Sequence, residues 1–317
     1  MHLLSGNEYG IQRWRLEDGQ EVGRQTGMKL RAISVSRDGK WIVCGTVKGA
    51  SVWDSRMHAK VIDVEGVNGV VAVDVSPDSA RFATGTATND NTASIWSITT
   101  GQRLVGPLQY DDRVTGVKFS PNGEHFAIAR FGGSIRIFNS HNGDGLIAIN
   151  TLIPELSPIT PLAWSSDSQR IFSACRDNNI RAFNVSTQGS QLTGSLILSG
   201  GSNGHDVYSI SLAPNGKFIA IVARQSVSFL DTLTLEQIGP VIQDSRHMRS
   251  ITVSPDSRYL TTGDLDGKFF IHDLGNILSD SYGPFYVSSI CNFVILASWT
   301  SPIPSPMPTN YLGAHQR

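Results

Sequence analysis

The residues of this 317-residue chain that could carry out chemistry do not form a catalytic pattern. The segment Gly263-Asp-Leu-Asp-Gly267-Lys268 is one residue short of a phosphate-binding loop, and it continues with Phe269 where a hydroxyl residue is required. Its two aspartates lack the twelve-residue loop and the final glutamate of a calcium site. We therefore interpret the segment as a β-turn in which Asp266 has a structural role.

Nucleophiles and metal ligands are also scattered. No segment reads G-x-S-x-G, H-E-x-x-H or C-x-x-C, and the eight histidines show no short-range pairing. The cysteines Cys44, Cys175 and Cys291 are far apart, which favours buried thiols in a reducing compartment over a disulfide framework or a zinc site. The sequence thus predicts a protein that is not an enzyme and that holds no cofactor and no metal.

The composition is that of a globular protein without a strong overall charge. The chain is 40% hydrophobic, and 26 Lys and Arg residues against 27 Asp and Glu residues give a net charge of −1. This balance disfavours nucleic acid and acidic membranes as partners. The first residues lack the pattern of a secretory signal, and the most apolar window, 285–299, is too short and too polar to span a bilayer. We expect a cytoplasmic protein, with the nucleus as the alternative location.

One turn-forming phrase recurs along the chain at intervals of 40 to 48 residues. It places Pro, Asp, Asn, Gly and Ser where a tight turn favours them, because Pro presets φ and Asp or Asn bonds its own backbone. The copies are VSRDG (35–39), VSPDS (75–79), FSPNG (119–123), WSSDS (164–168), LAPNG (212–216) and VSPDS (253–257).

Apolar runs with strand-like alternation surround each phrase. One run precedes it and a second follows, a third ends on an aromatic or other large residue, and a looser fourth run such as RLVGPL (103–108) completes the unit. The pattern predicts repeated four-stranded antiparallel units without helices. The third runs are GIQRWR (10–15), GASVWD (49–54), TASIWS (92–97), SIRIFN (134–139), NIRAFN (179–184), SVSFLD (226–231) and KFFIHD (268–273).

This pattern resembles the WD40 repeat family over residues 2–287, and Trp53-Asp54 is the dipeptide that names the family. The resemblance implies an all-β fold, namely a seven-bladed β-propeller of four-stranded antiparallel blades. It also implies structural roles for the residues that close the third strands and for the turn aspartates. These residues are Trp14, Trp53, Asp54, Trp96, Phe138, Phe183, Asp90, Asp177 and Asp266.

The chain departs from the family pattern in one respect, because no blade carries the full hydrogen-bonded set of His, Ser or Thr, Asp and Trp. The turn aspartate is replaced by Val47, Gly132 and Arg224 in three blades, and the Gly-His pair appears plainly only at 204–205. We therefore expect packing to stabilise the blades more than this network does. A looser similarity, through TTGQRLVGPL (99–108), is to the WD40 arrays of fungal NACHT-type incompatibility regulators.

Two kinds of loop share one rim in such a ring, because antiparallel strands return to the same end at every second connection. Arginine and aromatic residues in these loops are candidates for partner contact, since they bury large areas and offer directed donors. The loops between second and third strands contribute Phe131, Arg176 and Arg224; those entering the innermost strands contribute Asp111, Asp112, Arg113, His205, Tyr208, His247 and Arg249.

We therefore expect a non-catalytic scaffold, monomeric on its own, that binds an acidic segment of a protein or peptide partner across this rim. Two alternatives stay open. One is a sensor or ligand-recognition module related to the fungal NACHT-type regulators. The other is a propeller enzyme, which would need carboxylates in the central channel, where Asp74 is the main candidate.

The strand count leaves one innermost position empty, in the blade opened by residues 2–15. An unfilled position would expose an unpaired strand edge in the middle of the ring. The β-branched run at 288–299 has the composition of a strand. We expect Ile290 to Ala297 to pair antiparallel with His2 to Gly6, after GPFYV (283–287) has formed the outer strand of the final blade.

The domain prediction follows from this closure. Residues 1–287 would form the propeller, 288–299 its closing strand, and the Pro-rich residues 300–317 a disordered, unpaired tail. The alternative is that the whole segment 288–317 is an appended tail on an incomplete ring.

Overall fold

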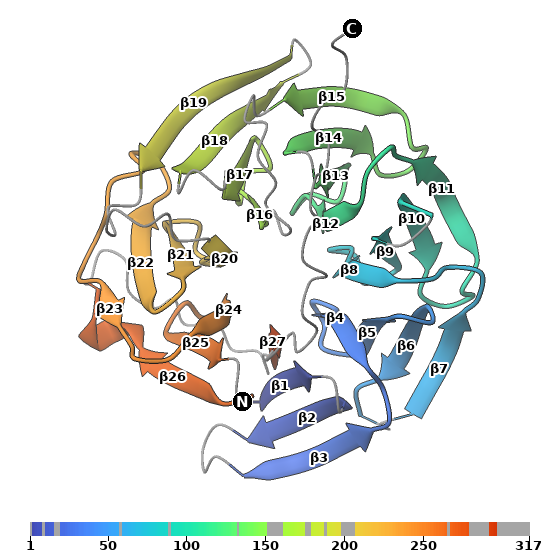
Figure 1. The fold of residues 1–317 in the computed structure, drawn as a ribbon, viewed down its shortest axis with the longest axis horizontal. Helices are drawn as coiled ribbons and strands as arrows, with labels where there is room; N and C mark the ends of the chain where they lie inside the picture. The colour runs from blue at the N-terminus through green and yellow to red at the C-terminus, as the bar shows by residue number, and fades with distance from the viewer. Residues whose placement is uncertain are drawn as a thin grey trace, which may run out of the picture.

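The computed structural model describes residues 2–7, 10–15, 20–56, 59–87, 90–131, 133–150, 161–174, 179–186, 189–197, 207–264, 267–278 and 292–296. This part of the chain contains 27 β-strands and one short 3-10 helix, Leu274–Asn276. The strands form seven sheets arranged as a ring around a central channel (Figure 1). The prediction of an all-β, seven-bladed propeller is therefore confirmed.

Each sheet, or blade, extends from the centre of the ring to its periphery. The innermost strands are β4 (Leu30–Val35), β8 (Val70–Val75), β12 (Val114–Phe119), β16 (Leu162–Trp164), β20 (Val207–Leu212), β24 (Met248–Val253) and β27 (Asn292–Leu296). The second strands are β1 (His2–Asn7), β5 (Trp41–Thr46), β9 (Arg81–Thr86), β13 (His125–Arg130), β17 (Arg170–Ala174), β21 (Phe218–Ala223) and β25 (Tyr259–Asp264).

The third strands are β2 (Gly10–Arg15), β6 (Ala50–Asp54), β10 (Thr92–Ser97), β14 (Ser134–Asn139), β18 (Asn179–Ser186), β22 (Ser226–Asp231) and β26 (Phe269–Asp273). The outer strands are β3 (Glu21–Thr26), β7 (Ala59–Val64), β11 (Arg103–Gln109), β15 (Gly145–Asn150), β19 (Gly189–Ile197) and β23 (Ile242–Gln243). Blade 1 contains β27 and β1 to β3, and blades 2 to 7 follow in chain order from β4 to β26.

The recurring turn phrase joins the first and second strands of a blade through a side-chain network. In blade 5, Ser165 Oγ donates to Asp167 Oδ1 and accepts from the amide of Arg170 at 2.8 Å. The Asp167 carboxylate also accepts from the amide of Gln169 at 3.0 Å. Serine and aspartate thus satisfy the backbone groups that the tight turn leaves unpaired, which explains why the phrase repeats.

The last residue of the recurring phrase has a left-handed backbone conformation, and it alternates between glycine and serine around the ring. Glycine occupies it in blades 2, 4 and 6, and serine occupies it in blades 3, 5 and 7, with φ of 58° at Ser79, 61° at Ser168 and 58° at Ser257. Ser168 Oγ accepts from the amide of Asn122 in the preceding blade at 3.1 Å, and Ser257 is bonded in the same way to the turn before it. These serines therefore tie neighbouring blades together.

The taper toward the channel requires small residues in the second strands. A Cβ added at Gly85 would lie 2.6 Å from Val114 Cγ1 on the innermost strand of the next blade. Gly45 is in the same position in blade 2, against Val70 at 2.7 Å. Larger residues there would push the inner strands apart, whereas the second strands carry large buried residues at other positions, such as Phe82 and Phe126.

The closing strand is where the structure departs from the sequence prediction. Asn292–Leu296 does pair with β1, as expected, but the two strands run parallel, with His2 opposite Asn292 and Gly6 opposite Leu296. The predicted antiparallel pairing is therefore wrong. The described part of blade 7 contains three strands, and β27 begins at the face of the ring at which the other innermost strands end. The predicted outer strand at 283–287 and the tail at 300–317 lie outside the described residues.

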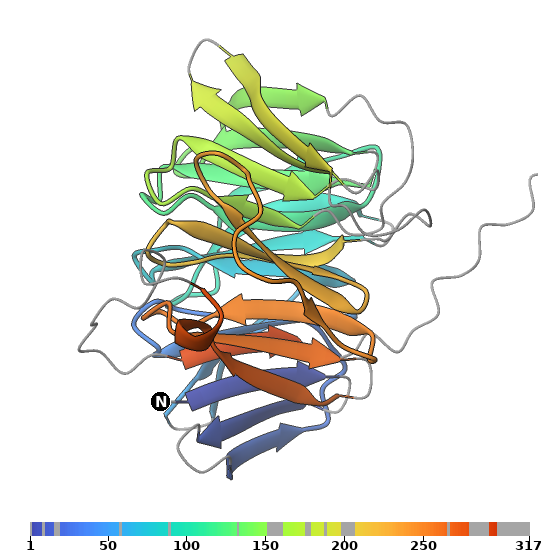
Figure 2. The same cartoon turned by 90° about the vertical axis from the view of Figure 1, so that its left-hand side faces the viewer.

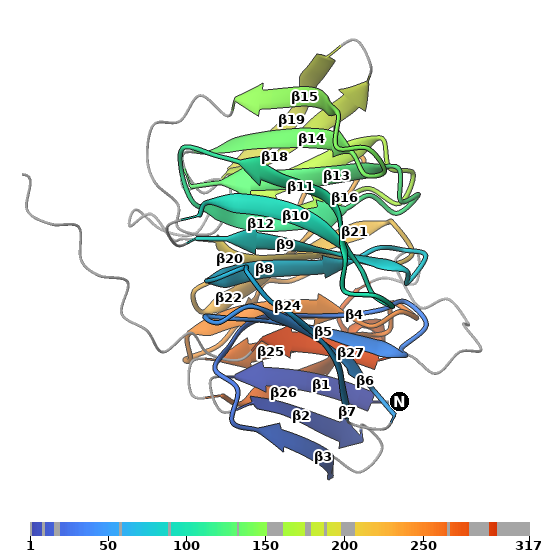
Figure 3. The same ribbon diagram turned by 90° about the vertical axis from the view of Figure 1, so that its right-hand side faces the viewer.

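Seen from the side, the strands run between the two faces of the ring, so the connections gather at the faces (Figures 2 and 3). We call the face with the recurring turns the turn face. The opposite face carries the loops that enter the innermost strands and the loops that join second to third strands, and we call it the rim face. The candidate partner-binding residues that the structure describes belong to the rim face.

Candidate partner-binding rim

Backbone hydrogen bonds fix the loops of the rim face relative to one another. In blade 4, the amide of Phe131 donates to the carbonyl of Arg113 at 2.9 Å. Between blades 6 and 7, the amide of Met248 donates to the carbonyl of Arg224 at 2.7 Å. The candidate side chains therefore project from loops that are held in place, which lowers the entropy lost on binding a partner.

Blade 4 brings one predicted pair of residues together. The guanidinium of Arg113 lies over the ring of Phe131, 5.7 Å from its centroid, and Arg113 is exposed. The neighbouring Asp112 accepts from the backbone amide of Arg113 at 2.7 Å, and Asp111 is exposed. The side chain of Arg113 is thus oriented by an aromatic ring, while its donors face solvent.

A second pair connects blades 6 and 7. The guanidinium of Arg249, on β24, lies 3.9 Å from the ring centroid of Tyr208 on β20. The Nε atom of Arg249 is buried and has no hydrogen-bond partner among the described residues. Within the same residues, neither Arg113 nor Arg249 forms an ion pair with a carboxylate. Both cations are therefore available to an acidic group from outside the chain.

Arg224 occupies the tight turn between β21 and β22 with a φ of 50°. This left-handed conformation is uncommon for residues other than glycine, asparagine and aspartate, and it is costly for a long side chain. The exposed His247 follows on the loop that enters blade 7. Two further candidates of the predicted rim, Arg176 and His205, lie outside the described residues.

One arginine of this region was not predicted. Arg246 stacks 3.4 Å from the centroid of Phe270, and its Nε donates to Asp244 Oδ1 at 2.8 Å. The hydrogen bond from Arg246 lowers the pKa of the Asp244 carboxyl, so the pair is ionised over the physiological range. Because a carboxylate of its own chain already engages it, Arg246 is a weaker candidate for partner contact than Arg113 or Arg249.

Asp74, the candidate carboxylate of the channel, is engaged by two groups of blade 4. Lys118 Nζ lies 2.6 Å from Asp74 Oδ1, and the amide of Phe119 donates to Asp74 Oδ2 at 2.8 Å. Asp74 is almost fully buried, so these contacts hold the carboxylate between blades 3 and 4. Ser34 accepts from the amide of Val75 at the equivalent place between blades 2 and 3. The role of Asp74 is therefore to join blades, and among the described residues no three His, Cys, Asp or Glu residues cluster as metal ligands do.

Most of the large residues near the ends of the third strands are buried, and the tryptophans among them donate hydrogen bonds. Trp96 Nε1 donates to Thr84 Oγ1 at 2.9 Å, and Trp14 Nε1 donates to Ser5 Oγ at 3.0 Å. In blade 2, Cys44 replaces this hydroxyl residue, and Trp53 Nε1 instead donates to Ser51 at 2.8 Å. Burial raises the pKa of the Cys44 thiol, which keeps it protonated and unreactive. Phe138 and Phe183 are buried between blades.

The turn aspartates behave differently from one another. Asp54 accepts from the amide of Arg56 at 2.8 Å, whereas the side chain of Asp90 is exposed. Asp177 and Asp266 lie outside the described residues. In the last blade Asp264 is buried and accepts from the amide of Lys268 at 2.9 Å, so it has the turn-stabilising role that we assigned to Asp266.

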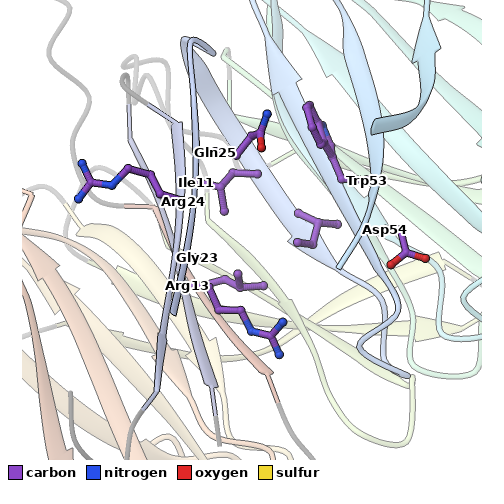
Figure 4. A pocket seen from close by; sticks show the side chains of 9 residues that line it. Ile11, Arg13, Gly23, Arg24, Gln25, Trp53 and Asp54 are labelled. Atoms are coloured by element: carbon purple, nitrogen blue, oxygen red, sulfur yellow. The ribbon is translucent and has the colours of Figure 1, made fainter. Parts of the chain in front are cut away.

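A small cavity lies between blades 1 and 2 (Figure 4). It has a floor of Leu4, Ile11 and Ile42, and Arg13 at its side donates to the carbonyl of Ser55 at 3.2 Å. Its volume is about 20 Å³, which has room for about one water molecule. The cavity is therefore too small for an organic ligand.

No helix within the described ranges is long and apolar enough to cross a bilayer.

Comparison with known proteins agrees with this fold. The model of the WD domain, G-beta repeat (WD40), matches residues 61–97, 102–139, 152–184 and 240–273. The chain is 30% identical to the small ribosomal subunit protein RACK1 of Drosophila melanogaster over 53% of its own length and 54% of that protein. It is 22% identical to the intraflagellar transport protein 122 homolog of Xenopus tropicalis over 81% of its own length but only 21% of that protein. The chain thus spans about half of one relative and about a fifth of the other.

Solved structures support the architecture alone, because their sequence identity is low. The Cps50 (Swd1) β-propeller domain of Myceliophteria thermophila superposes with a TM-score of 0.70 at 13% identity, covering 86% of this chain and 96% of that one. Hydrazine synthase of Kuenenia stuttgartiensis gives a TM-score of 0.73, also at 13% identity, over 86% of this chain and 95% of the other. The four matched segments and the seven-bladed ring make the chain similar to the WD40 repeat family.

Proposed function

We propose that this propeller is a non-catalytic scaffold whose rim face binds an acidic segment of a protein or peptide partner. The observation that carries the proposal is the presence of two arginine–aromatic pairs, Arg113 with Phe131 and Arg249 with Tyr208. They project from loops on opposite sides of the channel, at β12 and at β20 and β24 (Figure 1). An extended segment that crosses the channel could contact both pairs.

The chemistry of the pairs favours a carboxylate-bearing partner. A guanidinium that already stacks on an aromatic ring has lost part of its rotational freedom, so less entropy is lost when it binds a carboxylate. Arginine, tyrosine and phenylalanine are also enriched in the energetically important centres of protein interfaces. The names of the relatives, one a small ribosomal subunit protein and one an intraflagellar transport protein, are compatible with a scaffold role.

The experiment compares partners captured by the wild-type protein with those captured by Arg113→Glu and Arg249→Glu variants. Arg37→Glu is the matched control, because Arg37 is an exposed arginine of a blade 2 turn on the turn face. We expect the rim variants to lose specific partners that the control retains, as measured by quantitative mass spectrometry, while all four proteins give the same thermal melting curve. An identical partner set from all four proteins would remove the rim as the binding surface.

We place this function in the cytoplasm or the nucleus of the cell. The similarity to fungal NACHT-type regulators stays a prediction. A sensor module of that kind would use the same rim face.

A further inference from the structure

Tyr110 is a buried residue at the seam between blades 3 and 4. It follows the outer strand β11, its amide donates to the carbonyl of Asn91 at 3.0 Å, and only 5% of its surface is exposed. Its ring packs in one apolar cluster with Val114 and Phe138 of blade 4. The seam therefore holds the phenol ring firmly in place.

The hydroxyl group of Tyr110 lacks a hydrogen-bond partner. Its Oη atom is fully buried, and no described residue donates to it or accepts from it. Burial raises the pKa of Tyr110, so the phenol stays protonated and needs an acceptor. A buried donor without an acceptor is destabilising, and native structures contain few of them.

The two arginines beside the ring cannot act as that acceptor. The guanidinium carbons of Arg130 and Arg136 lie 5.6 and 5.7 Å from the centroid of the Tyr110 ring, and a guanidinium only donates hydrogen bonds. Arg130 is held by a hydrogen bond from its Nε to Ser134 Oγ at 2.6 Å. Among the described residues, no carboxylate forms an ion pair with either arginine.

Arg136, on β14, occupies a position of the repeat at which three other blades have serine. Two residues before the large residue that closes the third strand, blades 2, 3 and 6 carry Ser51, Ser94 and Ser228, whereas blades 4 and 5 carry Arg136 and Arg181. Arg136 is exposed whereas the hydroxyl is not, so a ligand would reach the hydroxyl only when side chains of the seam move aside. One oxyanion would offer an acceptor to the orphaned hydroxyl and a negative charge to the two cations beside the ring.

We propose that Tyr110, Arg130 and Arg136 form a binding site for a phosphate group. A phosphate monoester carries a charge of about −1.5 to −2 at neutral pH and offers three terminal acceptor oxygens. This charge matches two guanidinium groups, and the three oxygens match two guanidiniums and one phenol hydroxyl. A carboxylate has half the charge and one oxygen fewer. The phosphate would be either free inorganic phosphate or the phosphorylated side chain of a protein.

The test measures binding by isothermal titration calorimetry to the full chain. Three probes are used: inorganic phosphate, a short peptide with a central phosphoserine, and the same peptide with glutamate at that position. The variants are Tyr110→Phe, which removes only the hydroxyl, and Arg136→Gln. Arg103→Gln is the matched control, because Arg103 stacks on Trp96 at 4.6 Å in the neighbouring blade in the same way.

We expect wild type and Arg103→Gln to bind a phosphate probe equally, and both Tyr110→Phe and Arg136→Gln to bind it about tenfold more weakly, the effect of one charge-assisted hydrogen bond. Tighter binding of the phosphopeptide than of inorganic phosphate would assign the source to a phosphorylated protein; the reverse would assign it to the free ion. Equal affinity in all four proteins, no binding by wild type, or equally tight binding of the glutamate peptide would overturn the site.

A second readout does not depend on the ligand. If the hydroxyl of Tyr110 has no acceptor in the free protein, Tyr110→Phe in phosphate-free buffer should melt at the wild-type temperature or above it, because the variant removes an unsatisfied group. A clearly lower melting temperature would mean that the hydroxyl is already satisfied within the protein, and this result would also count against the site.

Discussion

Replacing Trp96 by alanine tests the packing between blades most directly. Trp96 is 4% exposed at the end of β10, its ring stacks 6.5 Å from that of Phe82, and its indole nitrogen donates to Thr84. A buried aromatic side chain removes about 150–250 Å² from water, which at about 25 cal/mol per Å² corresponds to roughly 4–6 kcal/mol. Measured costs of such truncations are about 3–5 kcal/mol, so we expect Trp96→Ala to lose stability in that range.

The hydrogen bond can be separated from the packing with a double-mutant cycle of Trp96→Phe and Thr84→Val. Each single variant leaves one buried partner unsatisfied, and the coupling energy should be about 0.5–1.5 kcal/mol. Equilibrium urea denaturation gives the free energy of unfolding and, through the slope, checks that the two-state assumption holds. Leu104→Ala is the control, because Leu104 is 50% exposed on β11 and its loss should change stability by less than about 0.5 kcal/mol. A loss below about 1 kcal/mol for Trp96→Ala would refute the placement of this side chain between blades.

Three further predictions concern the turns and the closure of the ring. The hydrogen bond from Ser165 lowers the pKa of the Asp167 carboxyl. The ionised carboxylate should therefore stabilise the fold above about pH 4, and this stabilisation should be lost as the pH falls through the pKa of Asp167 in the folded protein. Asp167→Asn should flatten this part of a plot of stability against pH. Ser168→Ala should cost about 1–2 kcal/mol in a urea titration, because it keeps the left-handed strain and loses the hydrogen bond from Asn122, whereas Ser168→Gly should be nearly neutral, because glycine relieves that strain; no loss for Ser168→Ala would show that the hydroxyl does not join the blades. Deleting residues 286–317 should abolish the cooperative thermal transition or cause aggregation through the opened strand edge, whereas deleting only 300–317 should not, and an unchanged melting curve for the longer deletion would show that β27 does not close the ring.

The repeated part of the fold could be predicted from the sequence because the information is local. The turn phrase ends one strand and begins the next through contacts within five residues, as at Ser165 and Arg170, so its recurrence locates two strands of each blade. A large residue such as Trp53 or Phe138 then marks the third strand. These signals were sufficient for the number of blades and for the chain segments at the rim.

The parts that could not be predicted depend on how the blades are assembled. The direction of β27 could not be read from its composition, because a run rich in β-branched residues is the same in either direction. The stacking of Arg249 on Tyr208 requires that β20 and β24 be neighbours in space. Arg136 carried a signal that could have been used, since serine occupies the same place in three other blades, but its nearness to Tyr110 depends on the assembled seam.

The parallel direction of β27 has a practical consequence for any experiment that attaches this protein to a surface or to a fluorophore. Both β1 and β27 begin at the turn face and end at the rim face, so His2 lies on the turn face and Leu296 ends beside the mouth of the channel. A tether joined before His2 would leave the proposed partner surface facing the solution. A tag placed directly after Leu296 would instead sit over that surface and compete with a partner for space, and the two orientations would give different apparent affinities for the same interaction.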